Sequence, residues 1–505
     1  MNKSKKSIFN MIFGLANQLI VLIVGLILPR LFIMEFGSEI NGLQSSISYV
    51  YTYIALLEAG IGTATIQALF GPLARENRDE ISEILSATNR QYKKVGTIYF
   101  TCMVIFAVAY PLTITTTVDR LTVSLMVFLS GVSSLMSFLF YGKFVLLLQA
   151  DGCSFVVMIV SLVNYILTHA IKIIFILKGY SIVSIYVASA FVPLVILILY
   201  ELYRRKNYAW VNYKAKPNMK AISQSKNVLV HQISNIVCNS TDVMVLTYVV
   251  RDLKLVSIYN LYTMIFDAVK TVIINIFSSV NFIMGQTYNS DVEKYREYHK
   301  IYELADFTVS FILYSVAYIM ILPFMSIYTK GITDINYVDP KLPILFVLIK
   351  LMMSVREPAA QVINYAGHFK KTQTRSIIEA GINLAVSVVC AYKLGIYGVL
   401  IGTVVALLYR TIDMYLYTSK RFLDRSVWYS VKQWVIYMAA FAGVVFINSH
   451  ITLNITGYVS FFINAIVVGL CLLVYYCAVT FIFNYKTVIK WMKIFVNYLK
   501  RRRGA

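Results

Sequence analysis

The chain has 505 residues, of which 59% are hydrophobic and 14% are charged, and its mean hydropathy is +0.70. Soluble domains have about half apolar and about a quarter charged residues, so this composition excludes a large soluble protein. A formal net charge of +22 can indicate a nucleic-acid partner. The positions of the charged residues along the chain decide whether it does.

About 14 apolar stretches follow one another along the chain, and nearly all reach the roughly 20 residues that cross a hydrocarbon core. The expected spans are residues 8–34, 40–68, 95–117, 121–147, 154–177, 182–203, 227–250, 255–285, 304–329, 341–363, 375–393, 395–418, 431–450 and 457–483. An even number of spans predicts that both termini lie on the same side of the membrane.

Lysine and arginine gather in every second connection between these spans. This bias predicts that the basic connections, and with them both termini, are cytoplasmic. Membrane topology therefore explains the basicity of the chain, and we expect no nucleic-acid partner. The connections on the other side are short, which leaves no room there for a separate catalytic domain.

The basic connection at residues 207–226 is the expected boundary between two lobes. We expect an N-terminal lobe at 1–206 with spans one to six, and a C-terminal lobe at 227–420 with spans seven to twelve. Two further spans at 421–483 and a basic tail at 484–505 follow. The tail has apolar residues at helical spacing between lysines, which is typical of a helix on a membrane surface, although a tail that only follows the charge bias fits equally well.

Features recur about 214 residues apart, which indicates that the two lobes are copies. The matched pairs are Gly71–Glu76 with Gly285–Ser290, Pro111 with Pro323, and Gln149–Gly152 with Tyr365–His368. Each lobe has an even number of spans, so both insert in the same orientation. The predicted fold is an all-α polytopic membrane protein with two six-helix lobes, related by a pseudo-two-fold axis along the membrane normal, plus two C-terminal helices.

Several ionisable residues fall inside the expected spans, where each costs about 3 kcal/mol and usually faces a cavity or a partner. The basic ones are Arg30, Lys172, Lys270, Lys350, Arg356 and Arg410, and the acidic ones are Glu58, Asp242, Asp267, Glu357, Glu379 and Asp413. They predict a hydrated cavity with basic walls, in which arginine and lysine grip a phosphate.

Simpler interpretations exist for some of these residues. Asp267 and Lys270 are three positions apart, as are Arg410 and Asp413, so each pair can neutralise itself on one helix face. Arg30 and Lys172 lie near the outer boundary and can extend toward the interface. Lys350 and Arg356 lie deeper, and Pro358 interrupts their span next to the charges, which favours a cavity-lining helix.

Sequence signatures of catalysis are missing. The chain has no G-x-x-x-x-G-K-[ST] loop, no H-E-x-x-H and no G-x-S-x-G, and its five histidines are scattered. We therefore expect no enzymatic activity, no bound metal and no cofactor.

Two groups of residues carry a resemblance to a known family. The first is the span from Asn17 to Arg30 followed by Phe36-Gly37 and Asn41-Gly42-Leu43, and the second is Ser240-Thr241-Asp242 followed by Val256-Ser257-Ile258-Tyr259. Together with the span count and the two halves, they resemble the Wzx-type polysaccharide flippases. These belong to the multidrug/oligosaccharidyl-lipid/polysaccharide exporter superfamily.

This resemblance implies that an undecaprenyl-diphosphate-linked oligosaccharide moves from the inner to the outer leaflet of the bacterial cytoplasmic membrane. Alternating access of two lobes would serve synthesis of capsule or other surface polysaccharide, beside a polymerase and a chain-length regulator. The expected substrate-binding residues are Arg30, Lys172, Lys270, Lys350 and Arg356, and the expected coupling or orienting residues are Glu58, Asp242, Asp267 and Glu379.

Two other classes of function stay open. A cation-coupled multidrug antiporter of the same superfamily would share the architecture, but typically has twelve spans and an acidic residue in span one, where this chain has Asn17 and Gln18. A membrane glycan polymerase would need a large outer loop with arginine or histidine, which the chain lacks.

Overall fold

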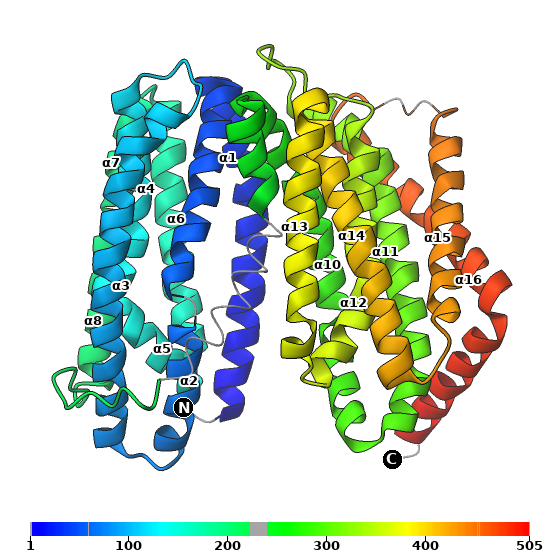
Figure 1. Ribbon diagram of the computed structural model, residues 1–505, viewed down its shortest axis with the longest axis horizontal. Helices are drawn as coiled ribbons and strands as arrows, with labels where there is room; N and C mark the ends of the chain where they lie inside the picture. The colour runs from blue at the N-terminus through cyan, green and yellow to red at the C-terminus, as the bar shows by residue number, and fades with distance from the viewer. Residues whose placement is uncertain (1–2, 59, 223–239, 452, 454, 504–505) are drawn as a thin grey trace. The chain divides into compact units, whose positions relative to one another are not determined.

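The computed structural model describes residues 3–58, 60–222, 240–451, 453 and 455–503 (Figure 1). Within these ranges it describes no side chain for residues 3–19, 22, 23, 57, 279, 282, 369, 370 and 490–503. The side chains of Asn17 and Gln18, and most of expected span seven, thus lie outside the described residues. All regular structure in the described ranges is helical, which confirms the predicted all-α class.

The chain forms two compact units, residues 1–257 and 258–505, referred to here as unit 1 and unit 2. Unit 1 includes the short helix Ser240–Val250, which follows the expected linker at 207–226. The hydroxyls of Ser46 and Thr247 are 2.9 Å apart, and Asn41 Nδ2 donates to Ser257 Oγ at 2.7 Å. These buried bonds hold the chain after the linker to unit 1.

Unit 1 is built from long helices joined by short connections. They are α1 (Lys3–Ile54), α2 (Ile61–Ala74), α3 (Arg78–Thr113), α4 (Arg120–Met136), α5 (Gly142–Ala150), α6 (Ser154–Leu177), α7 (Ile182–Ala190) and α8 (Val192–Asn207), with η1 (Ala55–Glu58), η2 (Ser137–Tyr141) and η3 (Leu246–Val250). The helices α1 and α6 pack together, as do α3 and α4. A backbone break at Gly37 (φ 84°) separates the expected first and second spans within α1.

Unit 2 repeats this pattern and adds two helices. Its elements are α10 (Leu253–Ser290), which begins at the end of unit 1, α11 (Val292–Tyr328), α12 (Leu342–Tyr365), α13 (Phe369–Leu394), α14 (Ile396–Thr418), η4 (Ser419–Leu423), α15 (Val427–Asn448) and α16 (Tyr458–Arg503). The helices α15 and α16 pack against α11, where Tyr437 and Thr480 hydroxyls bond Thr308. The helix α16 bends at Asn484, where the expected tail begins.

Ten helices in the described residues are long and apolar enough to cross a membrane, and they match ten of the fourteen expected spans. Expected span ten coincides with α12, whose Lys350, Arg356 and Glu357 lower its apolar character. Apolar side chains stay exposed along these helices, including Ile105, Val108, Leu177, Val389, Val459 and Val474. Surface this apolar needs lipid around it, so the protein is a multi-pass membrane protein.

Two local structures recur in the two units at about the spacing of the sequence repeats. The side chains of Asn77 and Asp291, 214 residues apart, cap α3 and α11 by accepting the backbone N–H of the third residue of each helix. Gly152 (φ 70°) and Gly367 (φ 64°) turn the chain at equivalent positions. Gly37 (φ 84°) and Arg251 (φ 59°) are also 214 residues apart and share a positive φ, and both lie in unit 1.

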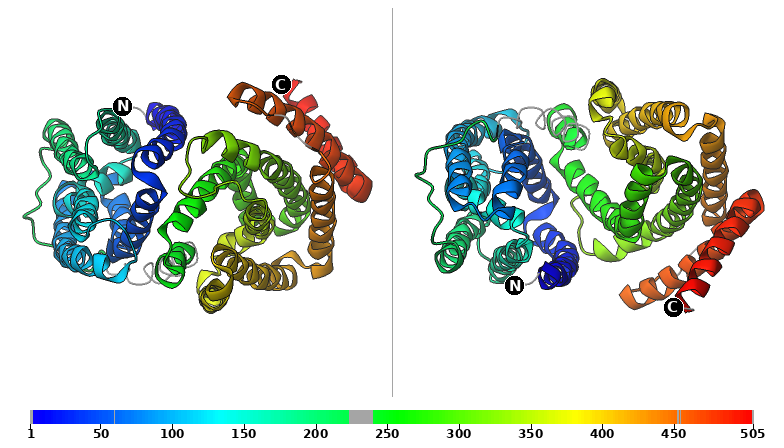
Figure 2. Two further views of the ribbon diagram at one scale, coloured as in Figure 1. Left: turned by 90° about the horizontal axis from the view of Figure 1, so that it is seen from above. Right: turned by 90° about the horizontal axis from the view of Figure 1, so that it is seen from below.

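The helices α13 and α14 pack side by side (Figure 2). The small residues Gly398 and Gly402 of α14 lie at this contact. A Cβ on Gly398 would lie 2.3 Å from the backbone carbonyl carbon of Cys390, and one on Gly402 would lie 2.5 Å from the backbone nitrogen of Ser387. The G-x-x-x-G spacing lets two helix backbones approach closely, and the approach here excludes any side chain.

Replacing Gly402 by alanine should therefore destabilise unit 2. We expect a loss of about 1–3 kcal/mol from overpacking, seen as a lower midpoint of thermal unfolding in detergent. The control is Gly381→Ala on α13, where no atom lies within 4 Å of the new Cβ, so its midpoint should stay the same or rise. Equal stability of the two variants would contradict the close approach.

A carboxylate between the expected first two spans ties α1 to the α3–α4 connection in unit 1. Glu39 accepts hydrogen bonds from Thr116 Oγ1 at 2.7 Å, from the Thr117 backbone N–H at 2.6 Å and from Thr117 Oγ1 at 2.7 Å. Partial burial acts to raise the pKa of Glu39, but these bonds and the charge of Lys254 outweigh it, so the pKa lies below its ordinary 4.5.

A lowered pKa in the folded state means that the Glu39 carboxylate stabilises the fold above pH 4.5 and that this contribution is lost as the pH falls below it. We expect wild type to exceed Glu39→Gln in unfolding midpoint at about pH 7, and the difference to shrink toward about pH 3. Thermal unfolding of both proteins across this range measures it. A difference that is independent of pH would show that the ionised form has no special role.

Candidate functional site

Charged side chains from neighbouring helices meet within unit 2. Lys350 of α12 is buried, and its Nζ lies 2.6 Å from Oδ1 of Asp267 on α10. The side chain of Asp267 is 50% exposed, so the pair borders accessible space. The short contact stabilises the pair.

A second set of ion pairs joins α12, α13 and α14. Arg356 Nη1 lies 2.6 Å from Oε1 of the buried Glu379, and Arg410 Nε lies 3.5 Å from the other oxygen of that carboxylate. Arg410 also contacts Asp413 at 2.8 Å, and Arg375 contacts Asp413 at 3.1 Å. The network satisfies charges that would otherwise be costly inside a membrane.

Lys270 on α10 differs from these cations. The charges of Lys350, Arg356, Asp267 and Glu357 act on it, but no described residue forms an ion pair or hydrogen bond with its ammonium group. The sequence left open that Asp267 neutralises Lys270 on the same helix, and the structure instead pairs Asp267 with Lys350. The alternative pairing of Arg410 with Asp413 is confirmed. Lys270 therefore remains a half-buried cation among ion pairs.

The structure thus brings five of the expected site residues together in unit 2. The other four, Arg30, Lys172, Glu58 and Asp242, belong to unit 1. Lys172 of α6 lies over the rings of Phe32 and Tyr186, and it lines a pocket of about 270 Å³ inside that unit. Its cation is held by aromatic faces as well as by polar neighbours of the pocket.

Glu58 lies in η1, at the break between α1 and α2, and accepts a hydrogen bond from Tyr92 of α3. Asp242 lies in the short helix before η3 and is buried. Both carboxylates are inside unit 1 and distant in sequence from the ion pairs of unit 2. Arg30 lies near the expected outer end of the first span and is partly exposed.

Sequence analysis missed a further buried group in unit 2. Glu303 of α11 forms an ion pair with Arg425, and only 8% of the Arg425 side chain is exposed. His299 Nε2 lies 3.2 Å from the backbone oxygen of Pro358. Asp306 is 1% exposed, and its Oδ2 has no partner among the described residues. Arg425 lies in a connection between expected spans, where a basic residue needs no special explanation, whereas Asp306 lies inside an expected span and could have been found as an aspartate there.

No protein-family model and no curated protein sequence matches the chain. Solved structures do match it. An inward-facing multidrug resistance MATE family transporter of the MOP superfamily aligns with a TM-score of 0.64 at 16% identity, over 80% of this chain and 95% of that one.

The lipid II flippase MurJ, in an inward closed conformation, aligns with a TM-score of 0.63 at 13% identity, over 95% of this chain and 100% of its own. The MATE multidrug transporter DinF-BH, in a ligand complex, aligns with a TM-score of 0.57 at 14% identity, over 83% and 96%. These likenesses show that the chain has the fold shared by the MATE and MurJ members of the MOP superfamily.

Proposed function

We propose that the protein is a Wzx-type flippase that moves an undecaprenyl-diphosphate-linked oligosaccharide from the inner to the outer leaflet by alternating access. In this proposal it works in the bacterial cytoplasmic membrane, with both termini cytoplasmic, during synthesis of capsule or another surface polysaccharide. A polymerase and a chain-length regulator, which act on the exported unit, are the proposed partners.

The observation that carries this proposal is the cation Lys270, which has no bonded carboxylate among the described residues, between the ion pairs of Lys350 and Arg356. A diphosphate offers adjacent negative charges and is held best where cations are preorganised away from bulk water. Asp267 is half exposed, so an incoming phosphate can displace it and take Lys350 as well.

The remaining charges receive proposed roles on the same basis. Arg30 and Lys172 of unit 1 are proposed to contact the headgroup or acidic sugars. Glu58, Asp242, Asp267 and Glu379 are proposed to orient the cations or to relay coupling ions. The MurJ likeness supports a lipid-linked substrate, since it extends over 95% of this chain, compared with 80% for the MATE transporter.

A second candidate is a cation-coupled multidrug antiporter. The MATE likenesses and the half-exposed carboxylate of Asp267 favour it, because an accessible carboxylate attracts a cationic drug. Efflux of a cationic rhodamine dye from cells that express the protein distinguishes the candidates, since the flippase proposal expects none.

Lys270→Gln should reduce transport of the lipid-linked oligosaccharide in reconstituted vesicles. Loss of one charge-assisted bond to phosphate weakens binding about tenfold or more, while no bonded partner in the described part of the protein loses its counter-ion. Lys270→Arg should retain most activity, because the charge stays.

The control for this measurement is Lys393→Gln, which removes an exposed lysine near the end of α13. It should transport like the wild type. Full transport by Lys270→Gln, or efflux of the rhodamine dye that depends on Asp267, would contradict the flippase assignment.

The role of Lys350 is tested by removing its carboxylate as well. Lys350→Gln leaves Asp267 without its counter-ion, so it should lose both stability and transport. The double variant Lys350→Gln/Asp267→Asn should recover stability but not transport, because the phosphate still lacks its lysine. Thermal unfolding and vesicle transport are measured on the same preparations. Recovery of transport by the double variant would show that Lys350 only neutralises the charge of Asp267.

A further inference from the structure

A polar stripe runs along α12 from the charged site toward the end of the helix. Lys350, Ser354, Glu357, Gln361 and Tyr365 recur at intervals of three or four positions, which places them on one face. Gln361 Nε2 donates to Glu357 Oε1 at 2.6 Å. The face thus changes along the helix from charged to uncharged polar groups.

A matching stripe runs along α10. Asp267 and Lys270 share a face with Asn281, Gly285 and Asn289, by the same three- or four-residue intervals continued through Ile274 and Ser278. Expected span eight ends at about residue 285, so Asn281 lies in its last turns, and Gln286, Asn289 and Ser290 follow it on the side that the charge bias predicts to be cytoplasmic. At about 1.5 Å per residue, Asn281 lies about 16 Å along the helix from Lys270.

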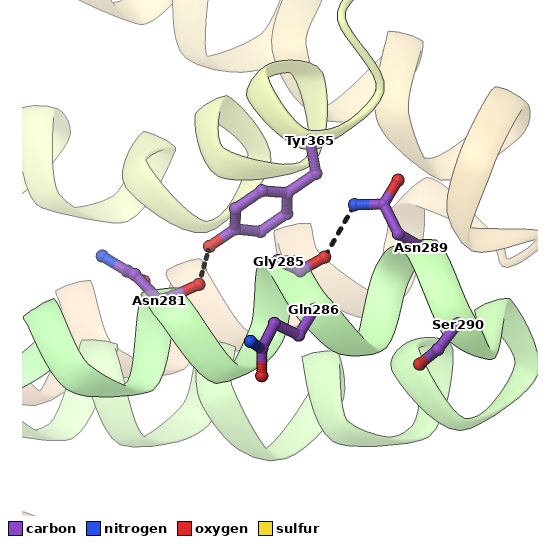
Figure 3. Close-up of a pocket in the computed structure, with 6 residues that line it drawn as sticks. All are labelled: Asn281, Gly285, Gln286, Asn289, Ser290 and Tyr365. Atoms are coloured by element: carbon purple, nitrogen blue, oxygen red, sulfur yellow. Dashed lines mark hydrogen bonds between the residues drawn. The ribbon is translucent and has the colours of Figure 1, made fainter. Parts of the chain in front are cut away.

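The two stripes meet in an open pocket of about 570 Å³ inside unit 2, lined by Asn281, Gly285, Gln286, Asn289, Ser290 and Tyr365 (Figure 3). Tyr365 OH donates to the backbone oxygen of Asn281 at 2.7 Å, as the dashed line in Figure 3 shows. A Cβ on Gly285 would lie 3.0 Å from the Tyr365 ring, so the glycine allows the ring to lie on α10. The volume falls within the range of about 300–1,000 Å³ of small-molecule sites.

The residues that line this pocket are all uncharged. Its side chains are amides, a hydroxyl and a phenol. Asn281 Oδ1 is buried and has no hydrogen-bond partner among the described residues, which makes it a costly acceptor. Amides both donate and accept, and therefore match the paired hydroxyls of a neutral sugar.

We infer that this amide pocket binds the neutral sugars of the lipid-linked substrate while Lys270 and Lys350 hold its diphosphate. The inference rests on the proposed flippase function and adds a sugar subsite to it. Sugars of an inner-leaflet lipid lie at the water-exposed surface, and the pocket lies at the end of expected span eight that the charge bias predicts to be cytoplasmic.

The experiment compares two probes with purified full-length protein in nanodiscs: undecaprenyl diphosphate bearing a neutral trisaccharide, and undecaprenyl diphosphate without sugar. The wild type should bind the first more tightly. The triple variant Asn281→Ala/Gln286→Ala/Asn289→Ala should bind the sugar-bearing lipid about tenfold more weakly and the sugar-free lipid as before, since it removes neutral hydrogen bonds only.

Two further variants guard against misfolding and unspecific effects. Gly285→Leu fills the pocket without removing an amide and should give the same selective loss. Asn207→Ala is the matched control, because Asn207 donates to the backbone oxygen of Tyr203 at the end of α8 as Asn289 donates to Gly285, and it should bind both lipids like the wild type.

Unchanged binding of the sugar-bearing lipid by the triple variant overturns the sugar subsite. Equal wild-type affinity for the two lipids overturns it too and leaves the flippase proposal standing. Failure of the wild type to bind either lipid overturns the flippase proposal itself.

Discussion

A charge inside a bilayer needs a partner or water, and this constraint organises unit 2. Asp267 and Lys350 join α10 to α12, and Glu379 joins α12 to α13 and α14 through Arg356 and Arg410. Each pair compensates most of its desolvation cost while it fixes the rotation of a helix about its axis. The helices that carry these charges are therefore also the helices whose faces are best defined, and Lys270 is held among them with its charge available.

Close packing of α13 against α14 supports the charged site. Gly398 and Gly402 let α14 approach the α13 backbone, and the Glu379 side chain reaches Arg356 and Arg410 from this pair of helices. Interhelical hydrogen bonds and van der Waals contact provide this stability, because lipid removes the hydrophobic drive that holds a soluble core together. A rigid pair of helices thus carries the carboxylate that positions two arginines.

Along the polar stripes of α10 and α12, the side chains change from charged groups to uncharged amides. Charged groups lie at mid-helix, where low dielectric strengthens their attraction for phosphate, and the amides lie at the end of expected span eight that is predicted to be cytoplasmic, where water is close. A lipid-linked glycan has the same order of groups, with a charged diphosphate followed by neutral sugars. The buried group of Glu303, Arg425 and Asp306 lies close to the α12 stripe, because the charges of Asp306 and Glu357 act on each other.

The sequence alone determined the membrane class, the order of spans and the repeat of about 214 residues, because hydropathy, charge bias and turn residues are local signals. It also identified Lys270, Lys350 and Arg356, since a charge within an apolar stretch is visible without a structure. Only the tertiary structure decided the partners: Asp267 bonds Lys350 across two helices and not Lys270 on its own, and Arg425 is buried on Glu303. The position of the lobe division at Ser257 and the meeting of Tyr365 with Asn281 also depend on contacts between residues far apart in sequence, which no local pattern encodes.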